Sequence, residues 1–434
     1  MKKHFLVILT ISLIIFGCEK RDTNEKEVPV LDIANAKSLI VLESYNKSTS
    51  SSGPLYKITL DGSFEEVKFI NPNDSDIDEG KTEVSVKSIL NVNSDFLILT
   101  GSFSVWDSMG NKQSYNTLLV RKSDGAIFDF GGDDNDIDCT SLLGDKPFQL
   151  DNFGNFYYSN HSGMVFKVDI SNPEAIVKSE YLPTGQKADC FGIESQGNCI
   201  YKYGESSGIT HSNATSNLRV KKTDGGIFEV NISGRDNKEF WIGNNGKIYF
   251  TTYTWSNGYK PLINSLNIDN GNVSIDTVWT SSSSDEDDAV GSFFRTQYQG
   301  SYLLRTNKSV VFIDTYFNRI KSFELFESSN TVRLIDLPPI EQGAIIVNSD
   351  LYYYIATGTD LYKVSFSDHS YSKLLNTGEY EVYAMTVSSD DVIQLSALRF
   401  SDGKKVFCQI DEKGNLTTID EEQDKKGIVM ERLD

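Results

Sequence analysis

The chain has 434 residues, of which 39% are hydrophobic and 12% aromatic, so it can bury a core and wholesale disorder is excluded. Acidic residues outnumber basic ones by 61 to 41, and the net charge of −20 argues against nucleic acid as a partner. Tyr and Phe number 21 and 25 while Met numbers only 5, a bias that favours pleated sheets over helix bundles.

Residues 1–18 have the form of a signal peptide, with Lys2 and Lys3 ahead of an apolar run, 5–16, that is too short to span a bilayer. The run ends in Ile15-Phe16-Gly17-Cys18, which resembles a bacterial lipobox. This resemblance implies that the Cys18 sulfur receives a diacylglycerol, that the peptide before it is cut, and that the new amino terminus is acylated. The alternatives are an ordinary secretory signal and an uncut anchor.

Residue 19 is Glu and not the Asp associated with inner-membrane retention, so the lipobox resemblance implies an outer-membrane lipoprotein. The side of that membrane, periplasmic or cell-surface, stays open. The polar segment that follows predicts a flexible tether over 19–37, with the folded domain over 38–434.

A strand of alternating apolar and polar residues then recurs along the chain, for example at 55–58, 165–168 and 361–364. Each copy runs into a hairpin-type turn, and a short apolar strand follows, such as 64–69 or 320–325. Eight such turns are predicted: Asp61-Gly62, Asp124-Gly125, Asn172-Pro173, Asp224-Gly225, Asn270-Gly271, Asn318, Asp368-His369 and Lys413-Gly414.

A second series of turns lies between these units, each with a strand before and after it. Its members are 151–155, Gln196-Gly197, Asn245-Gly246, Gln299-Gly300, Ser349-Asp350 and Asp390-Asp391. The repeat is therefore strand A, tight turn, strand B, longer loop, strand C, tight turn and strand D, with a period of roughly fifty residues.

Four-stranded units of this period predict an all-β fold, a single β-propeller of four-stranded blades. The turn count favours eight blades, seven being the alternative count, and a β-sandwich or two smaller propellers the alternative folds. The first unit lacks a strand A before Leu39, and a surplus strand, 428–433, follows the last unit. We therefore predict that the C-terminal strand becomes the inner strand of the first blade and closes the ring.

Over residues 39–433 the chain resembles the propeller lipoproteins of Gram-negative bacteria, with no subfamily assigned. In this topology the B–C and D–A loops share one face, and the A–B and C–D turns share the other. Binding residues are expected on the longer loops. The B–C loops predicted at 101–116, 203–217 and 253–260 supply candidate ligand-binding residues for a glycan: Trp106, Tyr115, Tyr203, His211, Trp255 and Tyr259.

The predicted D–A loops on that same face are acidic. Asp134, Asp136 and Asp138 alternate as oxygen ligands do in calcium loops, but the sixth position is Cys139 where a Gly is required. Calcium is therefore a weak candidate, a solvated acidic rim is the alternative, and no other cofactor is expected.

No catalytic residue is assigned, because Gly204-Glu205-Ser206-Ser207-Gly208 lacks the strand-to-helix context of a nucleophile elbow. His161, His211 and His369 are too scattered for a zinc site. Cys190 and Cys199 flank a turn that we expect to set Cys199 opposite Glu194, too far from Cys190 for a disulfide. We expect buried thiols, although the disulfide state of Cys139, Cys190, Cys199 and Cys408 stays open.

These observations predict a monomeric, non-catalytic cell-envelope lipoprotein that binds a glycan or a partner protein through its long-loop face. The alternative is a carbohydrate-active enzyme, a lyase or glycosidase working at the axial mouth, for which His211 with Tyr203 or Tyr259 is the best available set.

Overall fold

The alternating pattern of the sequence forms antiparallel strands, and no helix occurs in the part of the chain that the computed structural model describes. That part comprises residues 30–42, 52–60, 63–70, 82–106, 109–129, 148–160, 163–172, 175–183, 186, 188–203, 216–232, 235–243, 245, 247–254, 260–269, 272–280, 301–306, 308–314, 322–341, 343–375, 378–388, 390–422 and 427–433. Within it, no helix is long and apolar enough to cross a membrane.

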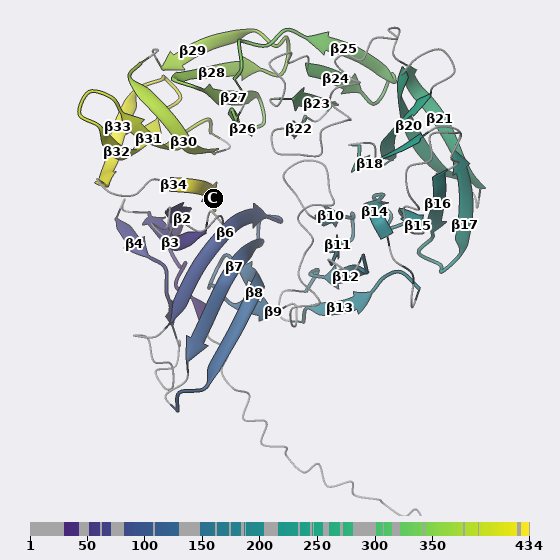
Figure 1. Ribbon diagram of the computed structural model, residues 1–434, viewed down its shortest axis with the longest axis horizontal. Helices are drawn as coiled ribbons and strands as arrows, with labels where there is room; N and C mark the ends of the chain where they lie inside the picture. Colours follow the sequence, from purple (N-terminus) through teal and green to yellow (C-terminus); the bar gives the residue numbers. More distant parts are fainter. Residues whose placement is uncertain are drawn as a thin grey trace, which may run out of the picture.

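The described strands form six separate four-stranded sheets, one eight-stranded sheet and one two-stranded sheet, and the larger sheets follow one another around a ring (Figure 1). We take the eight-stranded sheet as two blades, in line with the predicted count of eight, number the blades 1 to 8 in chain order, and call their strands A to D from the centre outward. Blade 1 contains β34 (Gly427–Arg432), β2 (Ala36–Leu42), β3 (Gly53–Thr59) and β4 (Phe64–Glu66). Blade 2 contains β6 (Glu83–Asn91), β7 (Phe96–Trp106), β8 (Lys112–Arg121) and β9 (Ile127–Asp129).

The next three blades repeat the same order without interruption. Blade 3 contains β10 (Phe148–Leu150), β11 (Asn155–Ser159), β12 (Val165–Asp169) and β13 (Val177–Glu180). Blade 4 contains β14 (Ala188–Ile193), β15 (Cys199–Tyr203), β16 (Ser216–Lys221) and β17 (Ile227–Ile232). Blade 5 contains β18 (Arg235–Ile242), β19 (Ile248–Thr254), β20 (Lys260–Asp269) and β21 (Asn272–Thr280).

Three further blades complete the ring. Blade 6 contains β22 (Ser301–Arg305), β23 (Ser309–Asp314), β24 (Ser322–Phe326) and β25 (Thr331–Ile335). Blade 7 contains β26 (Ile345–Asn348), β27 (Tyr352–Thr357), β28 (Asp360–Ser365) and β29 (Tyr371–Leu375). Blade 8 contains β30 (Tyr380–Val387), β31 (Ile393–Arg399), β32 (Lys404–Ile410) and β33 (Leu416–Glu422).

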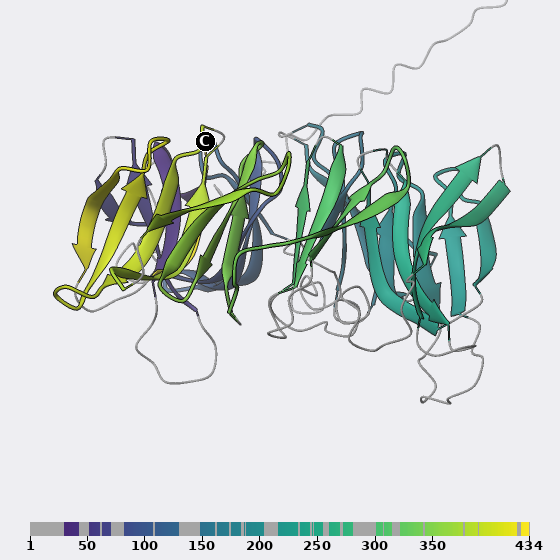
Figure 2. The same cartoon turned by 90° about the horizontal axis from the view of Figure 1, so that it is seen from above.

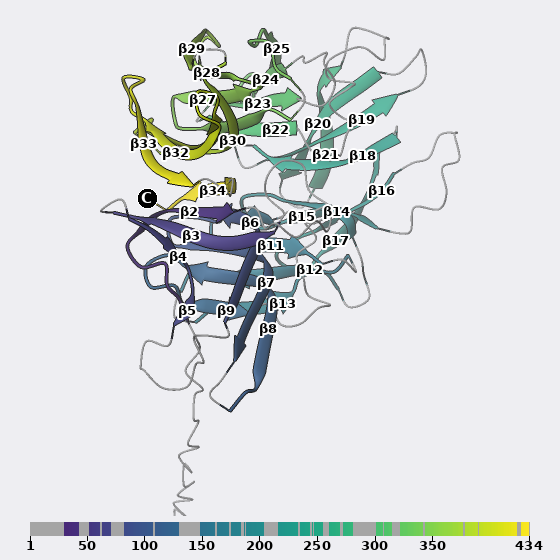
Figure 3. The ribbon, with the colours of Figure 1, turned by 60° about the vertical axis from the view of Figure 1, so that its left-hand side comes forward.

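The ring closes through the C-terminal strand, as the sequence predicted. β34 runs antiparallel to β2, with Leu39 opposite Glu431 and Ile40 opposite Met430. The two strands lie side by side in Figures 1 and 3, where the yellow end of the chain meets its purple beginning. This pairing removes the open edge that β2 would otherwise present.

Buried apolar clusters lie between successive blades and hold the ring together. Phe96 and Ile98 of blade 2, for example, pack with Phe156 and Tyr158 of blade 3, and the cluster around Ile40 and Phe407 joins blade 1 to blade 8. The middle strands have neighbours on both sides, so β11 is buried at every residue, whereas all four residues of the outer strand β13 are exposed. Each blade is therefore stabilised chiefly by the blades beside it.

Blades 1 and 2 are joined more tightly than the others. Pro54 of β3 pairs with Ser85 of β6, which merges the two blades into one continuous sheet. The short strands β1 (Val30–Leu31) and β5 (Phe69–Ile70) pair with each other as a separate sheet. The pairing of β3 with β6 joins two four-stranded groups into one eight-stranded sheet. The number of blades therefore depends on whether that sheet counts as one blade or two, and the count of eight stays a prediction.

The structure corrects three details of the predicted repeat. The segment 101–116 is not a long loop, because β7 continues to Trp106 and β8 begins at Lys112. The predicted strand 64–69 is split into β4 and β5. In blade 6, the A–B turn lies between β22 and β23 and the C–D turn between β24 and β25, so Gln299-Gly300 and Asn318 were assigned one strand too early.

The connections divide between the two ends of the ring. We call the end with the A–B and C–D turns the turn face, and the end with the B–C and D–A connections the loop face. β2 begins and β34 ends at the turn face, so both ends of the described chain lie there. Figure 2, in which the ring is seen edge-on, shows the C-terminus at this end.

Candidate binding face

The loop face carries the hairpin β7–β8 of blade 2, which is the longest hairpin of its sheet. Its register shifts between Thr100 and Phe103, a β-bulge that redirects the outer half of the hairpin. Gly101 lies at this bulge, where a Cβ would come within 2.1 Å of the Ser85 carbonyl oxygen. A residue without a side chain is therefore required for the hairpin to lie against β6.

Trp106 ends β7 and lies opposite Lys112, the first residue of β8. Its ring is partly buried, and the Lys112 Nζ lies 4.8 Å from the ring centroid, which is a cation–π contact. Met109, between the two strands, is 84% exposed. The hairpin end therefore combines an aromatic plane, an ammonium group and an apolar side chain.

Tyr115 belongs to the core and not to this surface. It lies opposite Phe103 and is 8% exposed, and both rings belong to the apolar cluster between blades 1 and 2. The sequence analysis put Tyr115 on an open loop, and this was wrong because the alternation of 113–117 continues the strand and turns Tyr115 inward.

The other candidate residues are less fully described. Tyr203 ends β15 opposite Ala188, with no description of its side chain. The candidates outside the described residues are Cys18, His211, Trp255, Tyr259, Asp134, Asp136 and Asp138. Among the described residues, no three His, Cys, Asp or Glu side chains come together as a metal site.

The cysteines that the structure describes in full are free thiols. Cys199 and Cys408 are both buried. Cys199 lies opposite Ile193 and not opposite Glu194, because the turn between β14 and β15 is one residue longer than predicted. Cys190 lies in β14, with its side chain outside the description, and Cys139 lies outside the described residues.

On the turn face, by contrast, hydrogen bonds run from blade to blade. Asn152 donates its backbone N–H to the Ser195 carbonyl at 2.9 Å, which joins blades 3 and 4. The Asn245 N–H donates to Glu327 at 3.2 Å, which joins blades 5 and 6, and the Ser349 hydroxyl donates to Asp391 at 2.5 Å, which joins blades 7 and 8. Hydrogen bonds on the turn face therefore join three pairs of neighbouring blades.

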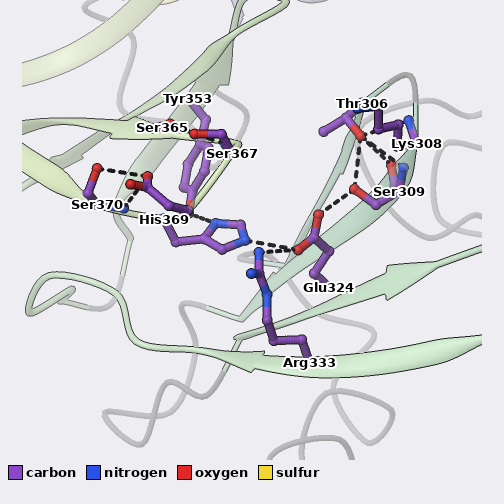
Figure 4. A network of polar contacts seen from close by, with 11 residues as sticks. Thr306, Lys308, Ser309, Glu324, Arg333, Tyr353, Ser365, Ser367, His369 and Ser370 are labelled. Atoms are coloured by element: carbon purple, nitrogen blue, oxygen red, sulfur yellow. Dashed lines mark hydrogen bonds and ion pairs between the residues drawn. The ribbon is translucent and has the colours of Figure 1, made fainter.

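A buried polar network that joins two blades centres on Glu324 of β24, which is 2% exposed (Figure 4). Its carboxylate accepts hydrogen bonds from the Ser309 hydroxyl at 2.5 Å, from Arg333 Nη2 at 2.6 Å and from His369 Nε2 at 3.1 Å. Ser309, Glu324 and Arg333 belong to blade 6 and His369 to the C–D turn of blade 7. The network therefore joins these two blades.

The pKa values in this network follow from the contacts. Burial alone would raise the pKa of Glu324, but hydrogen bonds from His369 and Ser309 and the nearby positive charges outweigh burial and lower it. Burial and the Glu324 charge raise the pKa of Tyr353, whose hydroxyl lies 3.0 Å from His369 Nδ1. Glu324 is thus ionised and Tyr353 protonated at neutral pH.

This network was missed in the sequence because its members come from two blades and four strands or turns. Ser309, His369 and Glu324 are the residue types of a hydrolytic triad, but their hydrogen bonds connect them in a different order. The carboxylate lies between Ser309 and His369, so the imidazole cannot take the hydroxyl proton as a general base. The arrangement suits a structural role, and it leaves the loop face as the candidate binding surface.

The fold and its two distinct faces define the chain as a β-propeller protein. No protein-family model matches the sequence, and no curated protein matches it. Solved structures are similar to it at low sequence identity. One is a puromycin-hydrolyzing peptidase of Mycobacterium tuberculosis, with 10% identity, a TM-score of 0.40 and coverage of 77% of this chain. The chain spans 53% of the length of that peptidase.

Two further similar structures cover more of their own chains. Dihydro-heme d1 dehydrogenase NirN has 9% identity and a TM-score of 0.46, over 92% of this chain and 75% of that one. Oligogalacturonate lyase from Vibrio parahaemolyticus has 10% identity and a TM-score of 0.41, over 88% of this chain and all of that one. Similarity at this level concerns the fold alone and says nothing about activity.

Proposed function

We propose that the protein is a lipid-anchored, non-catalytic binding protein of the bacterial cell envelope, and that its loop face binds a glycan. The observation that carries this proposal is the difference between the two faces. The turn face is occupied by bonds between blades and by both ends of the described chain. On the loop face, the tip of the β7–β8 hairpin exposes Met109 and Lys112, and Trp106 beside them is partly exposed.

A partly exposed indole suits a sugar, because the C–H face of a sugar ring packs on an aromatic plane while its hydroxyls bond polar neighbours. The end of the same hairpin carries exposed polar side chains, among them Asn111 and Ser114. The Lys112 ammonium near the indole adds a charged donor, which suits sugars that carry a carboxylate or sulfate group.

The binding test starts from a glycan array with the protein lacking residues 1–18, followed by calorimetry on the best ligand. We expect Trp106→Ala to weaken binding about tenfold, by analogy with nucleic-acid bases, whose stacking on an aromatic side chain is worth roughly 1–3 kcal/mol. Phe153→Ala is the matched control, because Phe153 is a 58% exposed aromatic residue on the turn face. Equal affinity in both variants, or an array with no ligand, would contradict the glycan proposal.

The anchor is tested separately by membrane fractionation. Cys18→Ala removes the only thiol that the lipobox resemblance would acylate, so the variant should either leave the membrane fraction or accumulate unprocessed. A variant that still fractionates with membranes at the mature size would show that the lipobox interpretation is wrong.

A further inference from the structure

The chain is fixed to the turn face from its first described residue onward. The Leu31 N–H donates to the Gly125 carbonyl at 2.9 Å, and the Asp32 N–H donates to the Lys68 carbonyl at 2.9 Å. The Asp32 carboxylate also lies 2.9 Å from the Nζ of Lys57, whose side chain is 5% exposed. Val30 therefore marks a firm point of attachment at the outer side of blades 1 and 2.

Eleven residues, 19–29, separate Cys18 from this point. At about 3.5 Å per residue they reach at most roughly 40 Å, and a flexible chain of this length spans on average only about 20 Å. If Cys18 carries acyl chains, this reach is the greatest distance between the lipid surface and the rim of the turn face at blades 1 and 2.

Large apolar side chains project from turns of this face on several sides of the ring. Leu60, in the C–D turn of blade 1, is 72% exposed, and Leu351, in the A–B turn of blade 7, is 66% exposed. Phe153 projects from the A–B turn of blade 3. All three occupy positions at the tips of tight turns, where a side chain meets whatever approaches the face.

The charged neighbours indicate what kind of surface this is. Exposed charges of both signs are interspersed with the apolar tips: Asp95, Asp124 and Asp350 are acidic, and Lys247, Lys308 and Lys413 are basic. An anionic lipid surface attracts clusters of basic residues, and these mixed charges form no such cluster. The pattern therefore fits a bilayer of low net charge.

We propose that the turn face lies flat on a lipid surface of low net charge, with Leu60, Phe153 and Leu351 in contact with lipid. This inference rests on the proposed lipid anchor but not on the identity of any glycan. The tether alone would bring only the rim near blades 1 and 2 to the membrane. Leu351 lies on blade 7, away from the attachment point. Lipid contact at Leu351 therefore distinguishes a docked turn face from a protein that is attached only through its tether.

The test is photocrosslinking of the full-length lipoprotein in vesicles of phosphatidylcholine and phosphatidylethanolamine. Photoreactive benzoylphenylalanine replaces Leu60, Phe153 or Leu351, one at a time. The matched controls are Met109 and Phe400, which are 84% and 45% exposed at B–C turns of the loop face. We expect lipid adducts, read by mass spectrometry, several-fold more abundant at all three turn-face positions than at either control.

Adducts confined to Leu60 would overturn the docking, since they would show tethering at the rim alone. Adducts at Phe400 equal to those at Leu351 would overturn it as well. The mass of the N-terminal peptide is read in the same experiment. An acylated peptide with no adduct at Leu351 refutes the docked face and leaves the anchor standing, whereas a peptide without acyl chains refutes both.

Discussion

At the scale of single residues, the buried carboxylate of Glu324 is the most consequential group that the structure adds to the sequence. Three donors from two blades converge on it, and its own side chain is 3% exposed. Arg333, at 44% exposure, can be solvated without its partner, but Ser309 and His369 cannot. Removing the carboxylate therefore leaves buried donors without an acceptor, which is costly.

We predict that Glu324→Gln lowers the free energy of unfolding by roughly 3 kcal/mol at neutral pH, because an amide cannot accept three donors as a carboxylate does. Chemical denaturation measures the loss. Glu412→Gln, at an exposed C–D turn of blade 8, is the control and should change stability by less than about 0.5 kcal/mol. Equal stability of the two variants would show that the network does not join the blades.

The same carboxylate gives the network a pH dependence of known sign. The pKa of Glu324 is lower in the folded protein than its ordinary value of 4.5. Its contribution is therefore complete above the unfolded pKa and is lost as the pH falls through the folded pKa. We expect the stability difference between the wild type and Glu324→Gln to shrink as the pH falls below about 4.5. A difference that stays constant down to pH 3 would contradict this assignment.

At the scale of elements, the turns explain which parts of the fold could be predicted from the sequence. Asp124-Gly125 and Asp224-Gly225 were recognisable because Gly adopts the positive φ that these turns require, 72° and 91°. Blade 6 was misplaced because Asn330 adopts a positive φ of 52° in its C–D turn, and no Gly marks the position. His369, with a φ of 59°, likewise stands where other C–D turns have Gly.

The His at position 369 was the one signal in the sequence for the Glu324 network. A His in a turn position that favours Gly needs a compensating contact. The partners themselves could not have been predicted. His369 and Glu324 lie 45 residues apart in the chain and meet only because blades 6 and 7 are neighbours. The hairpin with Trp106 was placed on the correct face, but the inward orientation of Tyr115 depended on a strand, β8, that the sequence analysis began too late.

The N-terminal attachment can be tested at a single turn. A Cβ at Gly125 would lie 1.8 Å from the Leu31 carbonyl oxygen, so Gly125→Ala should displace β1 from blade 2. Gly225 occupies the same turn position in blade 4, with a positive φ and no atom within 4 Å of a Cβ. Both variants should lose about 1–2 kcal/mol of stability, because Ala disfavours the left-handed backbone conformation. Only Gly125→Ala should speed hydrogen exchange at Leu31 and Asp32. Equal exchange in the two variants would contradict the attachment.

At the scale of the whole molecule, ring closure decides whether the blades act together. Each blade depends on its neighbours, so an open ring would leave blade 1 with an unpaired β2 and blade 8 with one face uncovered. Met430 of β34 is 6% exposed and packs in the cluster that contains Ile40 and Phe407. The Gly427 N–H donates to the Ser396 hydroxyl at 2.9 Å, which ties the start of β34 to blade 8.

We therefore predict that truncation after Gly427 costs roughly 5 kcal/mol, from lost strand pairing at about 1 kcal/mol per hydrogen bond and from the exposure of Met430. Deleting only Asp434 is the control and should leave thermal unfolding unchanged. Met430→Ala is a milder variant for the case in which the truncated chain does not fold. It should lower the free energy of unfolding by about 2–3 kcal/mol while β34 stays paired. If truncation leaves the melting temperature where it was, β34 does not close the ring, and the blades on either side must be held by the remaining interfaces alone.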